Sequence, residues 1–374
     1  MINENTLGKV AIAMSGGVDS SVAASLLKEQ GNICAGVTLK LFDAGSNLRE
    51  EGNLHEEGCF SWSDIEDARK VAARLNMPYY VIDLKSDFEH YVIQKLVNSY
   101  LMGETPNPCI DCNRHIKFGA LLGKVQELGY DYMATGHYIR KEYDRSAERF
   151  LLRKGLDHDK DQSYVLYTLT QRQLSSVLFP LGNLSKTQVR QIAKERGFIN
   201  ANKKDSQDIC FVPHGNHVSF METYTGEKFR TGKFMSLAGD IIGEHKGLPF
   251  YTLGQRKGLG LSLPRPGYVV DINPIQNTVT IGEEETLFSR EFYARAINLI
   301  TQKSIDKPIH VKVRVRYHQD EQWAVAEQTE EDELHIIFDK PQRAITPGQA
   351  AVLYDGDIVV GGGTIVRREV CARP

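Results

Sequence analysis

The sequence predicts an α/β protein in which a doubly wound parallel-sheet domain is followed by a small mixed or β central domain and a C-terminal antiparallel, barrel-like β domain. Apolar strands alternate with amphipathic helices over roughly the first 140 residues. Glycine becomes frequent from about residue 205, and short alternating strands follow residue 286. Because 374 residues exceed what one hydrophobic core usually serves, we expect three domains, with bounds 1–205, 206–285 and 286–374.

The N-terminal domain is expected to repeat a strand–helix unit. Buried strands are predicted over 9–15, 33–39, 78–84 and 131–137, and helices over 19–30, 63–76, 87–101 and 113–127. Gly31 ends the first of these helices. Repeated βα units make the strands parallel, and such sheets bind ligands at the carboxyl ends of their strands.

The C-terminal region has a strand pattern. IHVKVRVRYH (309–318) alternates apolar and polar residues, and WAVAEQ, ELHIIFD, AAVLYDGD and IVVGGGTIV follow with turns between them. This pattern is typical of an antiparallel sheet or small barrel. Lys312, Arg314 and Arg316 share one alternate face, which is either an ordinary charged face or one that meets RNA.

Composition and charge exclude several classes of protein. With 41% hydrophobic and 25% charged residues and no apolar run long enough to cross a membrane, we expect no membrane partner. The N-terminus carries no targeting pattern, so we expect a cytoplasmic protein. A net charge of −3 excludes a wholly basic nucleic-acid binder. A basic window over 186–204 is either a solvated helix face or a surface for RNA.

AMSGGVDSS (13–21) follows the first strand and precedes the first helix, where a phosphate-binding loop is expected. It lacks the Lys-Ser/Thr of a Walker A loop and the G-x-G-x-x-G of a dinucleotide site. Gly16 and Gly17 allow close approach of an anion, Ser15, Ser20 and Ser21 offer hydroxyls, and the helix start is electropositive. Asp19 suits this place only if a cation such as Mg²⁺ lies between it and the phosphate.

The chain has six cysteines, which are Cys34, Cys59, Cys109, Cys112, Cys210 and Cys371. Cys109 and Cys112 form a C-x-x-C, and Cys112 is expected near a helix N-terminus, which favours its thiolate. Cys210 follows the polar segment KKDSQDI. Three interpretations stay open: unrelated thiols, a zinc site that lacks a second ligand pair, or sulfur transfer in which one cysteine carries a persulfide and another resolves it as a disulfide.

SGGVDS resembles the PP-loop of ATP pyrophosphatases, which release pyrophosphate and leave AMP on a substrate oxygen. This loop, TPNPC-x-x-CN-x-x-IKF, ATGHY, KDQSYVLY, KDSQDICF, GLPFYTLGQRKGLG and TPGQAAVLY occur in the order found in tRNA-specific 2-thiouridylases. The resemblance implies ATP- and Mg²⁺-dependent adenylation of the C2 oxygen of the wobble uridine of tRNA. Sulfur then comes from a cysteine persulfide, supplied by a sulfur donor protein or a sulfide source.

The resemblance also implies a role for each matching residue. Cys210 carries the persulfide, Cys112 is the nucleophile and resolving thiol, and Asp19 serves catalysis at the loop. ATP binding is implied for Ala13, Met14, Ser15, Gly16, Gly17, Val18, Asp19, Ser20, Leu39 and Gly136. Asn107, Pro108 and Cys109 face the target base, and tRNA contacts are implied for His137, Lys160, Asp161, Gln162, Arg316, Tyr317 and Gln349.

Cys109 departs from the family pattern, because the best-known members carry an aspartate there. General acid–base work by that carboxylate is therefore not assumed. Cys109, Cys112 and Cys210 would alternatively hold three irons of a 4Fe-4S cluster whose fourth iron carries sulfide. Two further alternatives are another PP-loop ligase that needs no sulfur-carrying thiol, and an RNA-binding protein with a vestigial nucleotide fold. Cys34 is expected in the core, and Cys59 and Cys371 receive no role.

Overall fold

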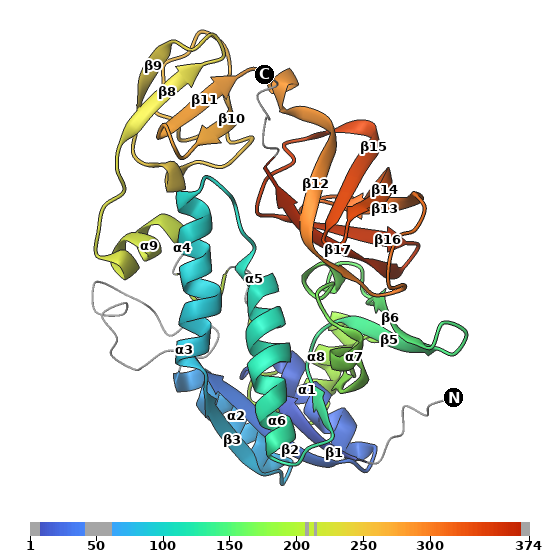
Figure 1. Cartoon of the computed structure of the whole chain (residues 1–374). Coiled ribbons are helices and arrows are strands. Elements are labelled where there is room, and N and C mark those ends of the chain that lie inside the picture. The colour runs from blue at the N-terminus through green and yellow to red at the C-terminus, as the bar shows by residue number, and fades with distance from the viewer. Residues whose placement is uncertain (1–7, 42–61, 206–208, 213–214, 368–374) are drawn as a thin grey trace. The chain divides into compact units, whose positions relative to one another are not determined.

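The protein is described here by a computed structural model covering residues 8–41, 62–205, 209–212 and 215–367 (Figure 1). Cys59 and Cys371 lie outside these residues. The chain forms two compact units, one of residues 1–92, 109–217 and 357–359 and the other of 93–108, 218–356 and 360–374. Within the described ranges, no helix is both long enough and apolar enough to cross a membrane.

The first unit is built on a five-stranded sheet in the order β3-β2-β1-β4-β7, in which all neighbours are parallel. The predicted parallel α/β domain is therefore confirmed. Its strands are β1 (Lys9–Ala13), β2 (Ile33–Lys40), β3 (Tyr79–Asp83), β4 (Tyr132–Ala134) and β7 (Val177–Leu178). Its helices are α1 (Val18–Glu29), α2 (Trp62–Arg74), α3 (Lys85–Phe88), α5 (Pro108–Asp111), α6 (Leu122–Glu127), α7 (Gln171–Ser175) and α8 (Lys186–Glu195).

One apolar core joins α1, α2 and α8 to β1. Val22 of α1, Val71 of α2 and Val189 of α8 are almost fully buried in a cluster that also contains Ile12 of β1. Burial of such apolar side chains is the main favourable contribution to the free energy of folding, at about 1.5–3 kcal/mol for each fully buried side chain. Cys34 belongs to the same cluster, as expected, and burial raises the pKa of its thiol.

The two predicted helices near the cysteines begin earlier than expected. The helix expected over 87–101 runs through α3, a π-helical turn over Glu89–Ile93 and α4 (Gln94–Leu101). The helix expected over 113–127 begins with α5 at Pro108 and continues through a π-helical stretch, Cys112–Leu121, into α6. Proline is favoured at the first helical position because its missing N–H needs no partner there.

A β-hairpin absent from the sequence prediction also lies in the first unit. It consists of β5 (Ile139–Asp144) and β6 (Arg149–Lys154). Asp357 binds it through ion pairs with Arg140 at 2.6 Å and Arg153 at 2.7 Å. Its charged, half-exposed strands lack the apolar alternation that would have predicted it.

The second unit contains a mixed four-stranded sheet in the order β10-β11-β8-β9, with β8 and β11 parallel. Its strands are β8 (Gly232–Ser236), β9 (Ile241–His245), β10 (Tyr268–Asn273) and β11 (Thr278–Gly282), and α9 (His217–Thr225) precedes them. Phe234, Val269 and Val279 form its core. The predicted mixed central sheet is thereby confirmed.

The second unit also contains a closed antiparallel β-barrel, as the sequence predicted. Its order is β12-β15-β14-β13-β16-β17, and pairing of β12 with β17 closes it. The strands are β12 (Phe288–Leu299), β13 (Ile309–Arg314), β14 (Gln322–Glu330), β15 (Glu333–Arg343), β16 (Ala350–Asp355) and β17 (Ile358–Val366). Val311 and Val313 point into the core, and the alternate Lys312 lies over the exposed ring of Trp323.

Candidate functional site

The predicted phosphate loop connects β1 to α1, as expected. Gly16 has a φ of +74°, and a side chain there would collide with the backbone of Asp64 in α2. A side chain at Gly136 would lie 2.8 Å from the backbone of Asp19 and Ser20, so this second glycine segment reaches the same helix start. No side chain caps α1, and its first N–H groups point out of the helix end, which suits an anion.

The serine hydroxyls shape the loop from within. Ser20 Oγ and Ser21 Oγ donate to the Gly17 carbonyl at 3.2 and 3.0 Å, and Ser20 Oγ accepts from the Ser15 N–H at 3.2 Å. The sequence offered these hydroxyls to the ligand. In the structure, the hydroxyls of Ser20 and Ser21 fix the turn whose backbone amides would meet phosphate.

Asn200 supports the loop from behind, although 184 residues separate it from Gly16. Its Nδ2 donates to the Gly16 carbonyl at 2.9 Å, the Gly17 carbonyl at 3.2 Å and Ser21 Oγ at 2.9 Å. The residue is 2% exposed. These three bonds hold the Gly16 and Gly17 carbonyls on the side of the loop that faces Asn200.

We expect Asn200→Leu, which keeps the size of the side chain but removes its donor, to raise the KM for ATP about tenfold, since buried carbonyls left without a donor cost roughly 1–3 kcal/mol. ATP-dependent pyrophosphate release measures it. The control is Asn202→Leu at an exposed position of the same segment. Equal KM values in the two variants would contradict this role of Asn200.

Lys186, which follows the N-cap of α8, supplies the lysine that the loop itself lacks. Its Nζ lies 2.8 Å from both carboxylate oxygens of Asp19, 167 residues away in the sequence. Tyr138 Oη donates to Asp19 Oδ1 at 2.6 Å. Burial, followed by the Asp19 carboxylate, raises the pKa of Tyr138, so this hydroxyl keeps its proton.

Asp205 lies on the other side of Lys186 and extends the network. It binds Lys186, Arg190 and Lys160, each at 2.8 Å. Burial alone would raise the pKa of Asp205, but hydrogen bonds from Lys160 and Lys186 outweigh it and hold the pKa below its usual value. The hydrogen bond to Asp205 raises the pKa of Lys160. The predicted tRNA contact Lys160 is therefore part of an ion-pair network that reaches Asp19.

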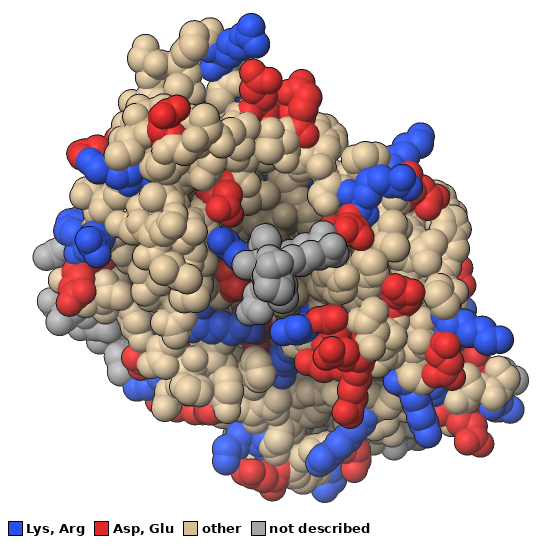
Figure 2. All heavy atoms as spheres, turned by 45° about the horizontal axis from the view of Figure 1, so that its top comes forward, with Lys and Arg blue, Asp and Glu red and all other residues tan. Residues whose placement is uncertain are grey.

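The basic window 186–204 is largely neutralised by acidic residues from elsewhere in the chain. Besides Lys186 and Arg190, Arg196 binds Glu29 at 2.6 Å, and Lys203 binds Asp64 at 2.7 Å and Asp67 at 2.8 Å. On the face drawn in Figure 2, basic and acidic groups are interspersed. Because these cations have acidic partners, the number of Lys and Arg residues within 186–204 overstates how basic the window is.

The three cysteines of the predicted sulfur chemistry differ in exposure. Cys109 is exposed, Cys112 is buried and Cys210 is intermediate. Because the helix begins at Pro108, Cys109 lies in its first turn and Cys112 lies after it. The favourable effect of the helix start on a thiolate is thus greater for Cys109 than the sequence indicated. Next to Cys210, the Phe211 ring packs edge-on against Phe88 at 5.2 Å.

Three of the predicted tRNA contacts make hydrogen bonds with other residues of the chain. His137 is 8% exposed, and its Nδ1 lies 2.8 Å from Thr135 Oγ1. Burial, and to a lesser extent Lys117, lowers the pKa of His137 well below its usual value, so its ring is neutral at pH 7. Asp161 accepts from Ser163 Oγ at 2.6 Å, and Gln162 Oε1 accepts from the Tyr138 N–H at 3.0 Å.

The remaining predicted residues lie in both units. Leu39, an expected nucleotide contact, is buried in β2. Asn107 and Pro108 lead into α5, and Tyr317 lies beside the His318 ring at 4.8 Å. Arg316 and Gln349 bind backbone groups of the second unit.

The 4Fe-4S alternative finds no support in the described part of the chain, where no three His, Cys, Asp or Glu side chains are grouped so that they could hold a metal ion. Cys109, Cys112 and Cys210 all lie within that part. They are therefore not arranged as cluster ligands.

Comparison with known proteins agrees with this architecture. Family models match residues 8–214 (tRNA methyl transferase HUP domain), 218–283 (tRNA methyl transferase PRC-barrel domain) and 289–365 (aminomethyltransferase beta-barrel domain). The tRNA-specific 2-thiouridylase MnmA of Clostridioides difficile is 47% identical over 357 residues, which cover 96% of this chain and 98% of the relative. The one of Moorella thermoacetica is 49% identical over 354 residues, which cover 95% and 98%.

The chain belongs to the tRNA-specific 2-thiouridylase family. This confirms the resemblance drawn from the sequence motifs. Membership in this family implies ATP with a divalent metal ion. A solved 4-thiouridine synthetase–RNA complex with bound ATP matches with a TM-score of 0.35 at 19% identity, and the match covers 55% of this chain and 46% of that chain.

Proposed function

We propose that this protein is an ATP-dependent tRNA-uridine 2-sulfurtransferase that converts the wobble uridine of tRNA to 2-thiouridine. The observation that carries the proposal is the loop at the start of α1, shaped by Asn200 and flanked by Lys186, in a chain whose relatives over its whole length are named 2-thiouridylases. We further propose a cytoplasmic location and domain bounds near residues 205 and 285. The three family-model matches support these bounds.

The loop would hold the phosphates of ATP while AMP is transferred to the C2 oxygen of uridine. Amides at the start of α1 and the Lys186 ammonium would stabilise the charge that develops on the departing pyrophosphate. Mg²⁺ typically binds proteins through one or two carboxylates together with substrate phosphates. Asp19, whose oxygens pair with Lys186 and Tyr138, is the loop carboxylate that would hold this ion, and the ion would further neutralise the pyrophosphate.

Adenylation makes the C2 oxygen a good leaving group, and the cysteines then deliver sulfur. We propose that the outer sulfur of a Cys210 persulfide attacks C2, and AMP leaves. The Cys112 thiolate next attacks the Cys210 sulfur, which releases 2-thiouridine and forms a Cys112–Cys210 disulfide. A reductant restores both thiols. The partial exposure of Cys210 suits loading by a sulfur donor protein that transfers persulfide sulfur, and the burial of Cys112 suits a resolving thiol. Sulfide would load Cys210 only by attacking the Cys112–Cys210 disulfide, which leaves a Cys210 persulfide and a Cys112 thiol.

Proton transfer by an aspartate at position 109 is not part of this proposal, because Cys109 stands there. His137 is held neutral and buried, so it suits contact with an uncharged base edge better than with a phosphate. Lys160, Asp161, Gln162, Arg316, Tyr317 and Gln349 remain proposed tRNA-side residues by family resemblance.

The purified protein, incubated with ATP, Mg²⁺, a donor of persulfide sulfur and unmodified tRNA, should form 2-thiouridine. We expect pyrophosphate release to require tRNA, and iodoacetamide to abolish thiolation. Nucleoside mass spectrometry and pyrophosphate release measure the two steps, with and without oxygen and with an iron chelator. Pyrophosphate release that survives alkylation and puts no sulfur into tRNA would point to another PP-loop ligase. Loss of thiolation on complete iron removal would contradict the persulfide route.

A further inference from the structure

The connection between β15 and β16 holds the segment that leads to the target-base residues. Gln349 Nε2 donates to the Thr105 carbonyl at 2.7 Å, and the Thr105 N–H donates to the Pro347 carbonyl at 2.9 Å. The N–H and the carbonyl of Thr105 are thus bound by Pro347 and Gln349, which are far away in the sequence. Asn107 lies two residues after Thr105, and Pro108 and Cys109 follow it.

We propose that Gln349 and Arg316 are positioning residues for the reaction, which fix the Gly103–Asn107 segment so that Asn107, Pro108 and Cys109 face the target base. This inference rests on the proposed function. It differs from the role in tRNA contact that the family resemblance gives these two residues, and the difference can be measured.

Close backbone approach strengthens the connection between the two segments. Gly348 has a φ of +89°, and a side chain there would lie 3.0 Å from Glu104 Cβ and 3.1 Å from the Thr105 backbone. Only glycine adopts this conformation readily and leaves room for the neighbouring chain. The TPGQ sequence therefore serves as a tight backbone contact with residues 104–105 and supplies one side-chain donor.

Arg316 holds the same connection from its other end. Its Nη2 donates to the Ala344 carbonyl at 3.2 Å, to Thr346 Oγ1 at 2.5 Å and to the Leu253 carbonyl at 3.2 Å. Ala344 has a φ of +51°, a conformation that L-residues adopt only when their surroundings enforce it. All three bonds leave one nitrogen, which has only two hydrogens, so at least one hydrogen is shared between two of these acceptors.

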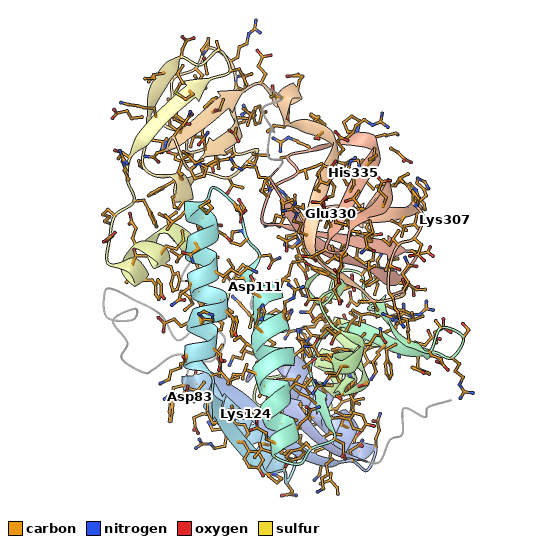
Figure 3. All side chains as sticks on the ribbon, in the orientation of Figure 1. Asp83, Asp111, Lys124, Lys307, Glu330 and His335 are labelled. Atoms are coloured by element: carbon orange, nitrogen blue, oxygen red, sulfur yellow. The ribbon has the colours of Figure 1, made fainter. Side chains whose placement is uncertain are left out.

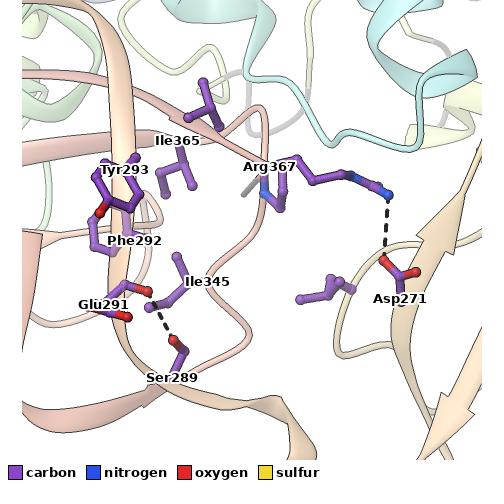
Figure 4. A pocket seen from close by; sticks show the side chains of 11 residues that line it. Asp271, Ser289, Glu291, Phe292, Tyr293, Ile345, Ile365 and Arg367 are labelled. Carbon is purple, nitrogen blue, oxygen red and sulfur yellow. Dashed lines mark hydrogen bonds and ion pairs between the residues drawn. The ribbon is translucent and has the colours of Figure 1, made fainter. Parts of the chain in front are cut away.

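A cavity borders the connection formed by residues 344–349, so side chains do not pack closely against it there. Ile345 and Pro347 line a cavity of about 190 Å³ together with Phe292 and Ile365 (Figure 4). Across it, Arg367 pairs with Asp271 at 3.5 Å and reaches the Gly103 carbonyl at 3.5 Å. Because apolar contacts leave this space, hydrogen bonds hold residues 344–349. They come from Arg316 and Gln349 and from backbone bonds that join Ala344 to Leu287 and residues 348–349 to Ile365.

The test is Gln349→Met, which keeps the length of the side chain and removes its donor. The matched control is Gln342→Met, since Gln342 in β15 donates only locally, to the Lys340 carbonyl at 2.8 Å. Three quantities are measured: the tRNA Kd, the single-turnover thiolation rate at saturating tRNA, and hydrogen exchange of residues 103–107 without tRNA. If Gln349→Met melts below the assay temperature, Gln349→Glu is measured in the same way.

We expect the saturating rate to fall about tenfold, the tRNA Kd to stay within twofold, and exchange at 103–107 to rise, because one hydrogen bond of this kind is worth roughly 1 kcal/mol. A saturating rate within twofold of the parent protein overturns the proposal, whatever happens to the Kd. A fall in rate without faster exchange also overturns it. If the parent protein itself does not thiolate tRNA, the proposed function fails, while the exchange comparison still tests the positioning.

Discussion

Cys210→Ser should abolish thiolation of tRNA while leaving tRNA binding and tRNA-dependent pyrophosphate release nearly intact. A serine hydroxyl cannot carry a persulfide, so activated uridine would form and no sulfur would follow. The loss should be complete within detection, because adenylation does not itself supply sulfur. Nucleoside mass spectrometry, filter binding and pyrophosphate release measure the three properties.

Two further cysteine variants give this experiment its controls. Cys34→Ala changes a thiol buried in β2 and should thiolate like the parent protein at a temperature where both are folded. Cys109→Ala should reduce the rate without making the remaining activity iron-dependent. Parent-like thiolation by Cys210→Ser would refute the assignment of the persulfide to Cys210.

Lys186→Met should lower tRNA-dependent pyrophosphate release by about 10²–10³-fold, the usual effect of removing one preorganised donor at a developing charge. The change removes the cation that lies 2.8 Å from Asp19 and from Asp205. Two carboxylates would then face each other without it.

The control for Lys186 is Lys124→Met, on the outer surface of α6 (Figure 3). Lys124 is exposed and pairs only across one helical turn, with Glu127 at 2.9 Å. Surface pairs of this kind contribute roughly 0–1 kcal/mol, so its activity should be unchanged. Lys186→Arg should recover part of the rate. If Lys186→Met releases pyrophosphate as fast as Lys124→Met, Lys186 has no part in adenylation.

Local patterns predicted the loop and its surroundings well. Residues 9–13 and 18–29 form the strand and helix expected on either side of SGGVDS, because an apolar run, two glycines and an amphipathic stretch act within a few residues of one another. The start of the cysteine-bearing helix was missed, although Pro108 was a signal available for it. The β5–β6 hairpin gave no such signal.

The partners of the loop could not be predicted in this way. Nothing near Lys186 or Asn200 indicates that either residue meets the loop, since the contacts span 167 and 184 residues. A lysine only 9% exposed beside an N-cap serine is a weak hint, visible only after folding. The basic window likewise looked free because its partners Glu29, Asp64 and Asp67 come from other elements.

The linear order of residues was sufficient for the chemistry this chain offers: a phosphate turn before a helix, a C-x-x-C, and a distant third thiol. Hydrophobic periodicity and turn residues act over short distances, so they can be read along the chain. Folding alone decided which charges pair with Asp19, how far each thiol is buried and which backbone holds Thr105, because ion pairs and hydrogen bonds depend on distance in space, which the packing of the sheet, helices and barrel establishes.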